Sequence, residues 1–126
     1  DHPKPSTYWN PETVLKVSEG RSKRIGSCSD TGHWYRSGLV PVDCIKQLNG
    51  RVIELHLKDL NEKKQDVPWG TGVTNAKGIM EALAAQKPTH KPVFFIEYET
   101  SHGTDLANNV GKCCENFSKY CEEMTK

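Results

Sequence analysis

The stretch from residue 52 to residue 72, VIELHLKDLNEKKQDVPWGTG, determines how the rest of the chain is interpreted. Its first seven residues alternate in character. The apolar positions are Ile53, Leu55 and Leu57, and the ionisable positions are Glu54, His56 and Lys58. A period of two predicts a β-strand with one apolar face and one polar face. A glycine-containing loop and a helical pattern follow, so this stretch is typical of a ligand-facing βα unit.

Helices and strands are predicted to alternate along the whole chain. Asn10 followed by Pro11 is typical of a helix start, and Asn49-Gly50 is typical of a helix end. The predicted helices cover about residues 10–20, 41–48, 75–86 and 105–124, and the predicted strands cover about residues 25–30, 52–58 and 93–98. This order favours an α/β fold with a parallel sheet and right-handed crossovers.

The ionisable rows of the strands distinguish between two parallel-sheet folds. In a doubly wound sheet both faces are covered by helices, so both rows should be apolar. Here one row holds ionisable residues, which favours the polar mouth of a closed (β/α)8 barrel. Such a barrel needs about 250 residues, whereas this chain has 126. We therefore expect residues 1–126 to form one partial domain, half of a TIM barrel, completed by an N-terminal half-barrel of a longer protein or by a homo-oligomer partner.

Composition argues against several classes of partner. The 17 basic and 16 acidic residues are well mixed and give a net charge of +1, so neither nucleic acid nor a membrane surface is expected as a partner. No apolar run approaches the ~20 residues that span a bilayer. The five cysteines show no CxxC spacing, which argues against a zinc knuckle. We expect mostly reduced thiols and a cytoplasmic location.

Three ionisable residues are predicted to meet at one end of the sheet. Asp30, His56 and Glu97 lie at or near the C-terminal ends of three successive strands. In a barrel these positions converge above the central axis, where the active site lies. Two carboxylates and one imidazole suit a divalent cation such as Mn, Mg, Co, Fe or Zn. Each residue alone could equally be a helix cap or a salt-bridge partner, so the prediction depends on their joint placement.

Four motifs carry a resemblance to a known family. They are DTGH at residues 30–33, HLKD at 56–59, DVPWGTG at 66–72 and IEYE at 96–99. Together they resemble the sugar phosphate isomerase/epimerase family of the xylose-isomerase-like TIM-barrel superfamily. The resemblance runs from His2 to the last predicted helix and corresponds to the C-terminal half of the barrel.

This resemblance implies roles for individual residues. Asp30, His56 and Glu97 would be metal ligands, and Glu97 would also act in catalysis. His33 would bind or protonate the substrate, with a structural imidazole as the alternative. Lys58 would contact a substrate oxygen, with an ion pair to Glu54 or Glu99 as the alternative.

The fourth family ligand is usually a glutamate on the fifth strand. This chain has Asp1-His2-Pro3 there, so His2 or a residue upstream would take that place. Family members that epimerise use two glutamates as paired acid and base, and the departure puts such a symmetric mechanism in doubt.

The implied function is a metal-dependent isomerase or epimerase of a small sugar or sugar phosphate. The reaction would abstract a proton next to a carbonyl through a metal-stabilised enediolate. Alternatives are a lyase or dehydratase acting on a keto-sugar or inosose, and a non-catalytic, truncated half-barrel. An endonuclease of the same superfamily is disfavoured by the neutral charge and by too few metal-ligating residues.

The remaining conspicuous residues have structural alternatives. Trp34 and Trp69 could form an apolar wall for a sugar ring or could pack in the core. The Gly70-Thr71-Gly72 loop could bind phosphate, but no arginine lies near it in sequence, which favours a tight turn before a helix. Cys113, Cys114 and Cys121 are expected to be packing residues on the last helix.

Overall fold

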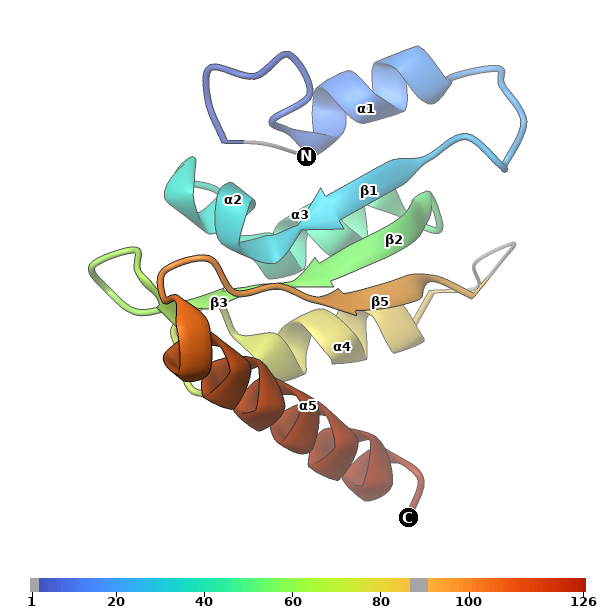
Figure 1. The fold of residues 1–126 in the computed structure, drawn as a ribbon. Helices are drawn as coiled ribbons and strands as arrows, with labels where there is room; N and C mark the ends of the chain where they lie inside the picture. Colours follow the sequence, from blue (N-terminus) through green and yellow to red (C-terminus); the bar gives the residue numbers. More distant parts are fainter. Residues whose placement is uncertain (1–2, 87–90) are drawn as a thin grey trace.

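Three parallel strands form the central sheet of the computed structural model, which describes residues 3–86 and 91–126 (Figure 1). The strands are β1 (Ser27–Asp30), β2 (Val52–Leu57) and β5 (Val93–Ile96), and they pair in the order β1-β2-β5. Neighbours in the sheet therefore follow the order of the chain, as in a barrel. A doubly wound sheet instead reverses its order at a switch point. His2, the predicted stand-in for the fourth ligand, lies outside the described residues.

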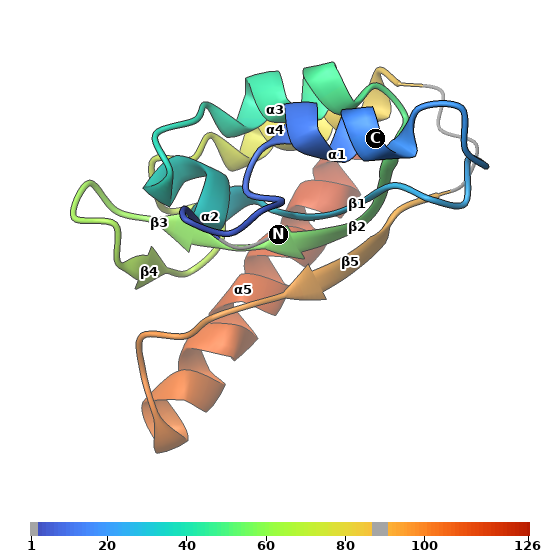
Figure 2. The same cartoon turned by 90° about the horizontal axis from the view of Figure 1, so that it is seen from above.

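Helices cover one face of this sheet. The helices of the chain are α1 (Pro11–Ser18), α2 (Thr31–Arg36), α3 (Pro41–Leu48), α4 (Ala76–Ala84) and α5 (Gly103–Met124), of which α2 lies at the C-terminal end of the sheet. Figure 2 shows α1, α3 and α4 on one side of the sheet, and α5 packs beside β5. The predicted helix signals are confirmed: the Asn10 side chain accepts a hydrogen bond from the Thr13 N–H at 2.8 Å, and Asn49 ends α3 in the left-handed conformation.

The core lies between the sheet and these helices. Leu55 and Leu57 of β2 are buried there, as the alternation predicted. At the start of the strand the register shifts between Ser27 and Cys28 of β1, and there Val52 is more buried than Ile53. The large side chains that pack against this row are Trp34, Ile45, Leu48, Ile79 and Leu83. With the apolar row buried, the ionisable row faces away from the helices.

Two elements were not predicted. Helix α2 begins directly after β1, and a hairpin of β3 (Asp59–Leu60) and β4 (Asp66–Val67) replaces most of the predicted polar loop. Both lie at the C-terminal end of the sheet, next to the ionisable residues. Among the described residues, no helix is both long and apolar enough to cross a membrane.

Candidate metal centre

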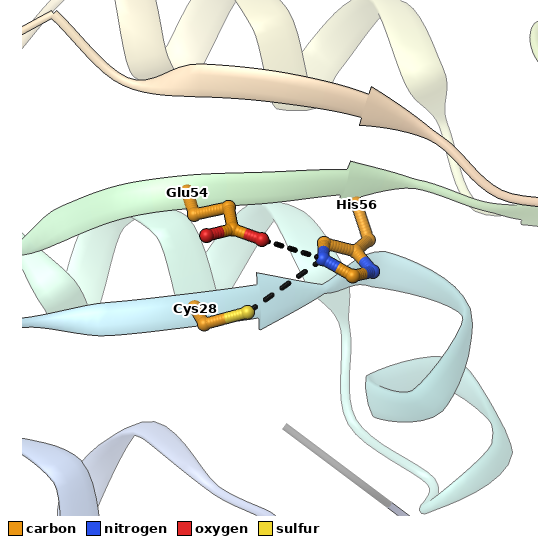
Figure 3. A group of neighbouring side chains, drawn as sticks. All are labelled: Cys28, Glu54 and His56. Atoms are coloured by element: carbon orange, nitrogen blue, oxygen red, sulfur yellow. Dashed lines mark hydrogen bonds and ion pairs between the residues drawn. The ribbon is translucent and has the colours of Figure 1, made fainter.

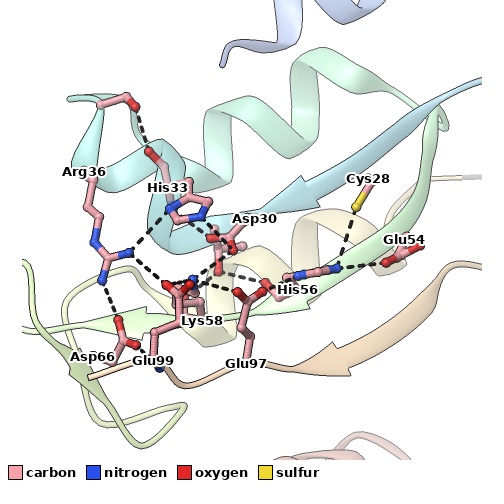
Figure 4. A network of polar contacts seen from close by, with 12 residues as sticks. Cys28, Asp30, His33, Arg36, Glu54, His56, Lys58, Asp66, Glu97 and Glu99 are labelled. Carbon is pink, nitrogen blue, oxygen red and sulfur yellow. Dashed lines mark hydrogen bonds and ion pairs between the residues drawn. The ribbon is translucent and has the colours of Figure 1, made fainter. Parts of the chain in front are cut away.

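Asp30, His56 and Glu97 converge as predicted, one from each strand (Figure 4). Asp30 and His56 are register partners, and Glu97 directly follows Ile96, the register partner of Leu57. One ligand atom from each of the three side chains lies within 4.8 Å of the other two. Asp30 and His56 lie at the same height, and Glu97 lies two residues beyond Phe95, the register partner of His56. Residues two apart on a strand point to the same face, so the parallel register brings the three side chains together.

Asp30 has a different contact on each carboxylate oxygen. As the N-cap of α2, it accepts the His33 N–H at 2.8 Å with Oδ1. Oδ2 is buried and receives no well-aligned hydrogen bond from the described part of the chain, although Lys58 Nζ lies 3.4 Å away and His33 Nε2 lies 3.7 Å away. Burial raises the pKa of Asp30 to about 6 even though Lys58 opposes this shift. Oδ2 is therefore an available ligand atom.

The His56 ring lies between two carboxylates. Its Nδ1 contacts the Glu97 carboxylate, and its Nε2 lies 2.8 Å from Glu54 Oε1. Burial opposes protonation of the ring, but the hydrogen bonds to Glu54 and Glu97 raise the pKa of His56. Burial acts to raise the pKa of Glu97, but its contacts with His56 and Lys58 outweigh this effect and lower the pKa to about 2. At neutral pH Glu97 is therefore ionised, as a metal ligand must be.

Lys58 provides the positive charge in the middle of this cluster. Its side chain is fully buried, and its Nζ lies 3.4 Å from Asp30 and 3.0 Å from Glu97 and also contacts Glu99. A Cβ on Gly32 would lie 2.7 Å from Lys58 Cγ and Cδ, so glycine allows the lysine stem to pass α2. The ion pair with Glu99, one of the two predicted alternatives, is present, whereas Glu54 contacts His56 instead. The ammonium group is enclosed by carboxylates, and its contact with a substrate oxygen stays a prediction.

His33 lies beside the cluster on α2. Burial, together with the charges of Lys58 and Arg36, lowers the pKa of His33 to about 4. The ring is therefore neutral at pH 7, and it could exchange a proton only as a neutral imidazole. Arg36 extends the network outward, because it binds Asp66 at 2.6 Å and lies 3.4 Å from Glu99.

The structure does not bring the tryptophans into this cluster. Trp34 is completely buried in the core. Trp69 is buried under α5, where its ring makes edge contacts with Phe117 at 5.4 Å and with Tyr120 at 5.9 Å between ring centroids. Both tryptophans therefore pack in the core, and the sugar contact of Trp69 stays a prediction. Cys113 also packs here, accepting the Trp69 N–H with Sγ at 3.3 Å.

The glycine loop binds an internal carboxylate. Asp59 Oδ2 accepts the N–H groups of Gly70 at 3.0 Å and Gly72 at 2.8 Å, and its Oδ1 accepts the Thr74 hydroxyl at 2.6 Å. A Cβ on Gly72 would lie 2.3 Å from the Leu60 carbonyl oxygen. The amides that could have bound phosphate are therefore already used, which confirms the tight-turn alternative.

Two neighbours of His56 were not predicted as site residues. Cys28 of β1 and Glu54 of β2 lie on the same face as Asp30 and His56, one layer further from the strand ends (Figure 3). Cys28 Sγ lies 3.7 Å from His56 Nε2. The period-two alternation contains the signal, because residues two apart on one strand share a face.

Comparison with known proteins supports the fold. No protein-family model and no curated protein matches the chain. A D-tagatose 3-epimerase-like protein superposes with a TM-score of 0.70 at 19% identity, over 99% of this chain and 46% of that chain. An uncharacterized protein from Parabacteroides distasonis superposes with a TM-score of 0.52 at 34% identity, over 88% of this chain and 44% of that one. The chain has the fold of half a TIM barrel. It spans less than half the length of either structure.

Proposed function

We propose that this chain carries the metal-binding half of a sugar isomerase or epimerase active site, with Asp30, His56 and Glu97 as ligands of one divalent cation. The observation that carries the proposal is the convergence of three ligand atoms from three adjacent parallel strands within 4.8 Å. The likeness to a D-tagatose 3-epimerase-like protein supports a small sugar or sugar phosphate as substrate.

The donor set fits a divalent cation. Asp30 Oδ2 is a buried acceptor that receives no well-aligned hydrogen bond from the described residues, and Glu97 is ionised. Two carboxylates and an imidazole match Mn, Mg, Co, Fe or Zn. When bound, the cation would polarise a substrate carbonyl and stabilise negative charge developing on its oxygen. His2 stays a prediction for a fourth ligand.

Two residues are candidates for moving the substrate proton. Glu97 is ionised and can accept a proton, but its contacts with His56 and Lys58 make it a weak base. His33 is neutral at pH 7 and lies beside Asp30, so it can accept a proton or donate one through its other ring nitrogen. We propose His33 as the proton carrier and Glu97 chiefly as a ligand. A lyase reaction would use the same two residues.

A second function is favoured by one specific observation. The buried Lys58 ammonium already neutralises carboxylates of the cluster, including both carboxylates of the proposed metal site. An internal cation in this position favours a non-catalytic half-barrel whose polar face is a structural ion-pair network. In either case we propose that a preceding half-barrel or a second copy completes the barrel.

Exchange of the substrate proton with solvent tests the enzyme proposal. The purified chain, loaded with MnCl2, is incubated with ketopentoses and ketohexoses in D2O, and deuterium entry next to the carbonyl is followed by proton NMR. We expect metal-dependent exchange that is lost in Asp30→Asn and kept in Glu62→Gln, a matched change at an exposed carboxylate. Absence of exchange in wild-type protein that binds Mn²⁺ would support the non-catalytic alternative.

A further inference from the structure

A second group of ligand atoms surrounds the other nitrogen of His56. Cys28 Sγ, a Glu54 carboxylate oxygen and a ring nitrogen of His56 all lie within 4.8 Å of one another. The three side chains come from adjoining positions on β1 and β2, with Cys28 and Glu54 as register partners (Figure 3). We propose that these three residues form a second site, which shares His56 with the Asp30–His56–Glu97 cluster, for a thiophilic divalent cation such as Zn²⁺.

The distances are close to those of a tetrahedral site. Zinc bonds of about 2.3 Å to sulfur and about 2.0 Å to nitrogen place these two atoms about 3.6 Å apart at a tetrahedral angle. Cys28 Sγ lies 3.7 Å from His56 Nε2. Glu54 Oε1 lies 2.8 Å from the same nitrogen, so the carboxylate must move outward by roughly 0.6 Å to reach a tetrahedral separation. The Glu54 side chain is 35% exposed and has room for this movement.

The ligand types separate this site from the Asp30–His56–Glu97 cluster. A thiolate selects zinc and other thiophilic cations, whereas an oxygen-rich set also accepts Mn and Mg. Cys28 is exposed, so a cation from solvent can reach it, and water can fill the fourth position. The thiol transfers its proton to water when the sulfur–metal bond forms. A metal site is thus chemically complete with no further protein ligand.

A cysteine nucleophile activated by histidine is the competing interpretation. Such a pair needs the imidazole nitrogen to be available to the thiol. Here Glu54 is closer to that nitrogen than Cys28 is, at 2.8 Å against 3.7 Å. The arrangement therefore favours binding of a cation.

A spectroscopic titration with Cd²⁺ or Co²⁺ tests this site. A metal–thiolate bond produces a charge-transfer band in the near ultraviolet, which does not depend on any enzyme activity. A neutral imidazole has only one available lone pair, so His56 can bind a cation in only one of the two sites at a time. The reduced chain is therefore first stripped of other divalent cations. We expect one equivalent of cation to produce the band in the wild-type chain.

Four variants assign the band. Cys28→Ser should abolish it, and Glu54→Gln should weaken cation affinity by roughly tenfold or more. Cys114→Ser, a matched change at another exposed thiol, should leave it unchanged. Asp30→Asn should also keep it, which separates this site from the proposed sugar-enzyme centre. A wild-type chain without the band, or a band that survives Cys28→Ser in protein with unchanged circular dichroism, would overturn the proposal.

Discussion

Replacing Lys58 by methionine should lower the stability of the folded chain and should make that stability depend on divalent metal. The side chain is fully buried, and its ammonium group contacts Asp30, Glu97 and Glu99. Methionine keeps much of the apolar stem but removes the charge. Asp30 and Glu97 are then left close together without their internal counter-ion.

The expected cost follows from the burial of each partner. Glu99 is 50% exposed, so its pairing contributes little. Asp30 is 3% exposed and Glu97 is 26% exposed, and breaking a buried ion pair costs about 3–5 kcal/mol. For a chain of this size, a loss of about 3 kcal/mol lowers the melting temperature by roughly 10 °C. If the two carboxylates are metal ligands, Mn²⁺ at 100 times its dissociation constant should restore about 2.7 kcal/mol.

Thermal unfolding followed by circular dichroism, with and without MnCl2, measures both effects. Lys77→Met is the matched control, because Lys77 is 74% exposed and lies 3.8 Å from Glu81, so its loss should change stability by less than about 0.5 kcal/mol. A Lys58→Met chain as stable as wild type would refute the role assigned to the ammonium group. A destabilised chain that Mn²⁺ fails to rescue would refute the proposed ligands.

Three further predictions concern stability and its dependence on pH. The pKa of His33 falls from 6.5 in the unfolded chain to about 4 in the folded chain, so the unfolded state binds more protons and stability falls as pH falls. Between pH 7 and pH 5 the lowered pKa of His33 should reduce the free energy of unfolding by about 2 kcal/mol. His33→Gln should remove that loss, as measured by urea unfolding at both pH values, and an unchanged pH dependence of stability would contradict the lowered pKa. Asp30, whose pKa is raised, contributes the opposite pH dependence to both proteins. Asp59→Asn should lose two charge-assisted hydrogen bonds and about 3–6 kcal/mol, and a loss below 1 kcal/mol would show that the loop does not depend on the carboxylate. Gly72→Ala should cost about 1–3 kcal/mol, because its Cβ would meet the Leu60 carbonyl oxygen; equal melting temperatures would contradict the close approach.

The sequence was sufficient to predict the three strands and the convergence of Asp30, His56 and Glu97. Alternation along β2 identified its buried face, and parallel strands place equivalent positions at one end of a sheet. Helix α2 was missed because its six residues are too few to show a helical period. Helix α2 also brings His33 beside Asp30. The DTGH motif indicated this proximity only through its resemblance to the family.

Other features depend on contacts that no local pattern encodes. The glycine loop turns its N–H groups toward Asp59, eleven and thirteen residues earlier in the chain. Trp69 packs against Phe117 and Tyr120 of α5, which lie far from it in the sequence. The spacing of the cysteines along the sequence does not reveal the grouping of Cys28 with Glu54 and His56, because these two partners lie on the neighbouring strand.

Direct measurement of metal bound per chain tests the central proposal. The EDTA-treated chain is titrated with Mn²⁺, and unbound Mn²⁺ is followed by electron paramagnetic resonance, for wild type and for the double variant Asp30→Asn/Glu97→Gln. The proposal predicts one bound Mn²⁺ per wild-type chain and none in the double variant at equal helical content. A wild-type chain that binds no Mn²⁺, or a double variant that binds it equally well, would contradict the proposal.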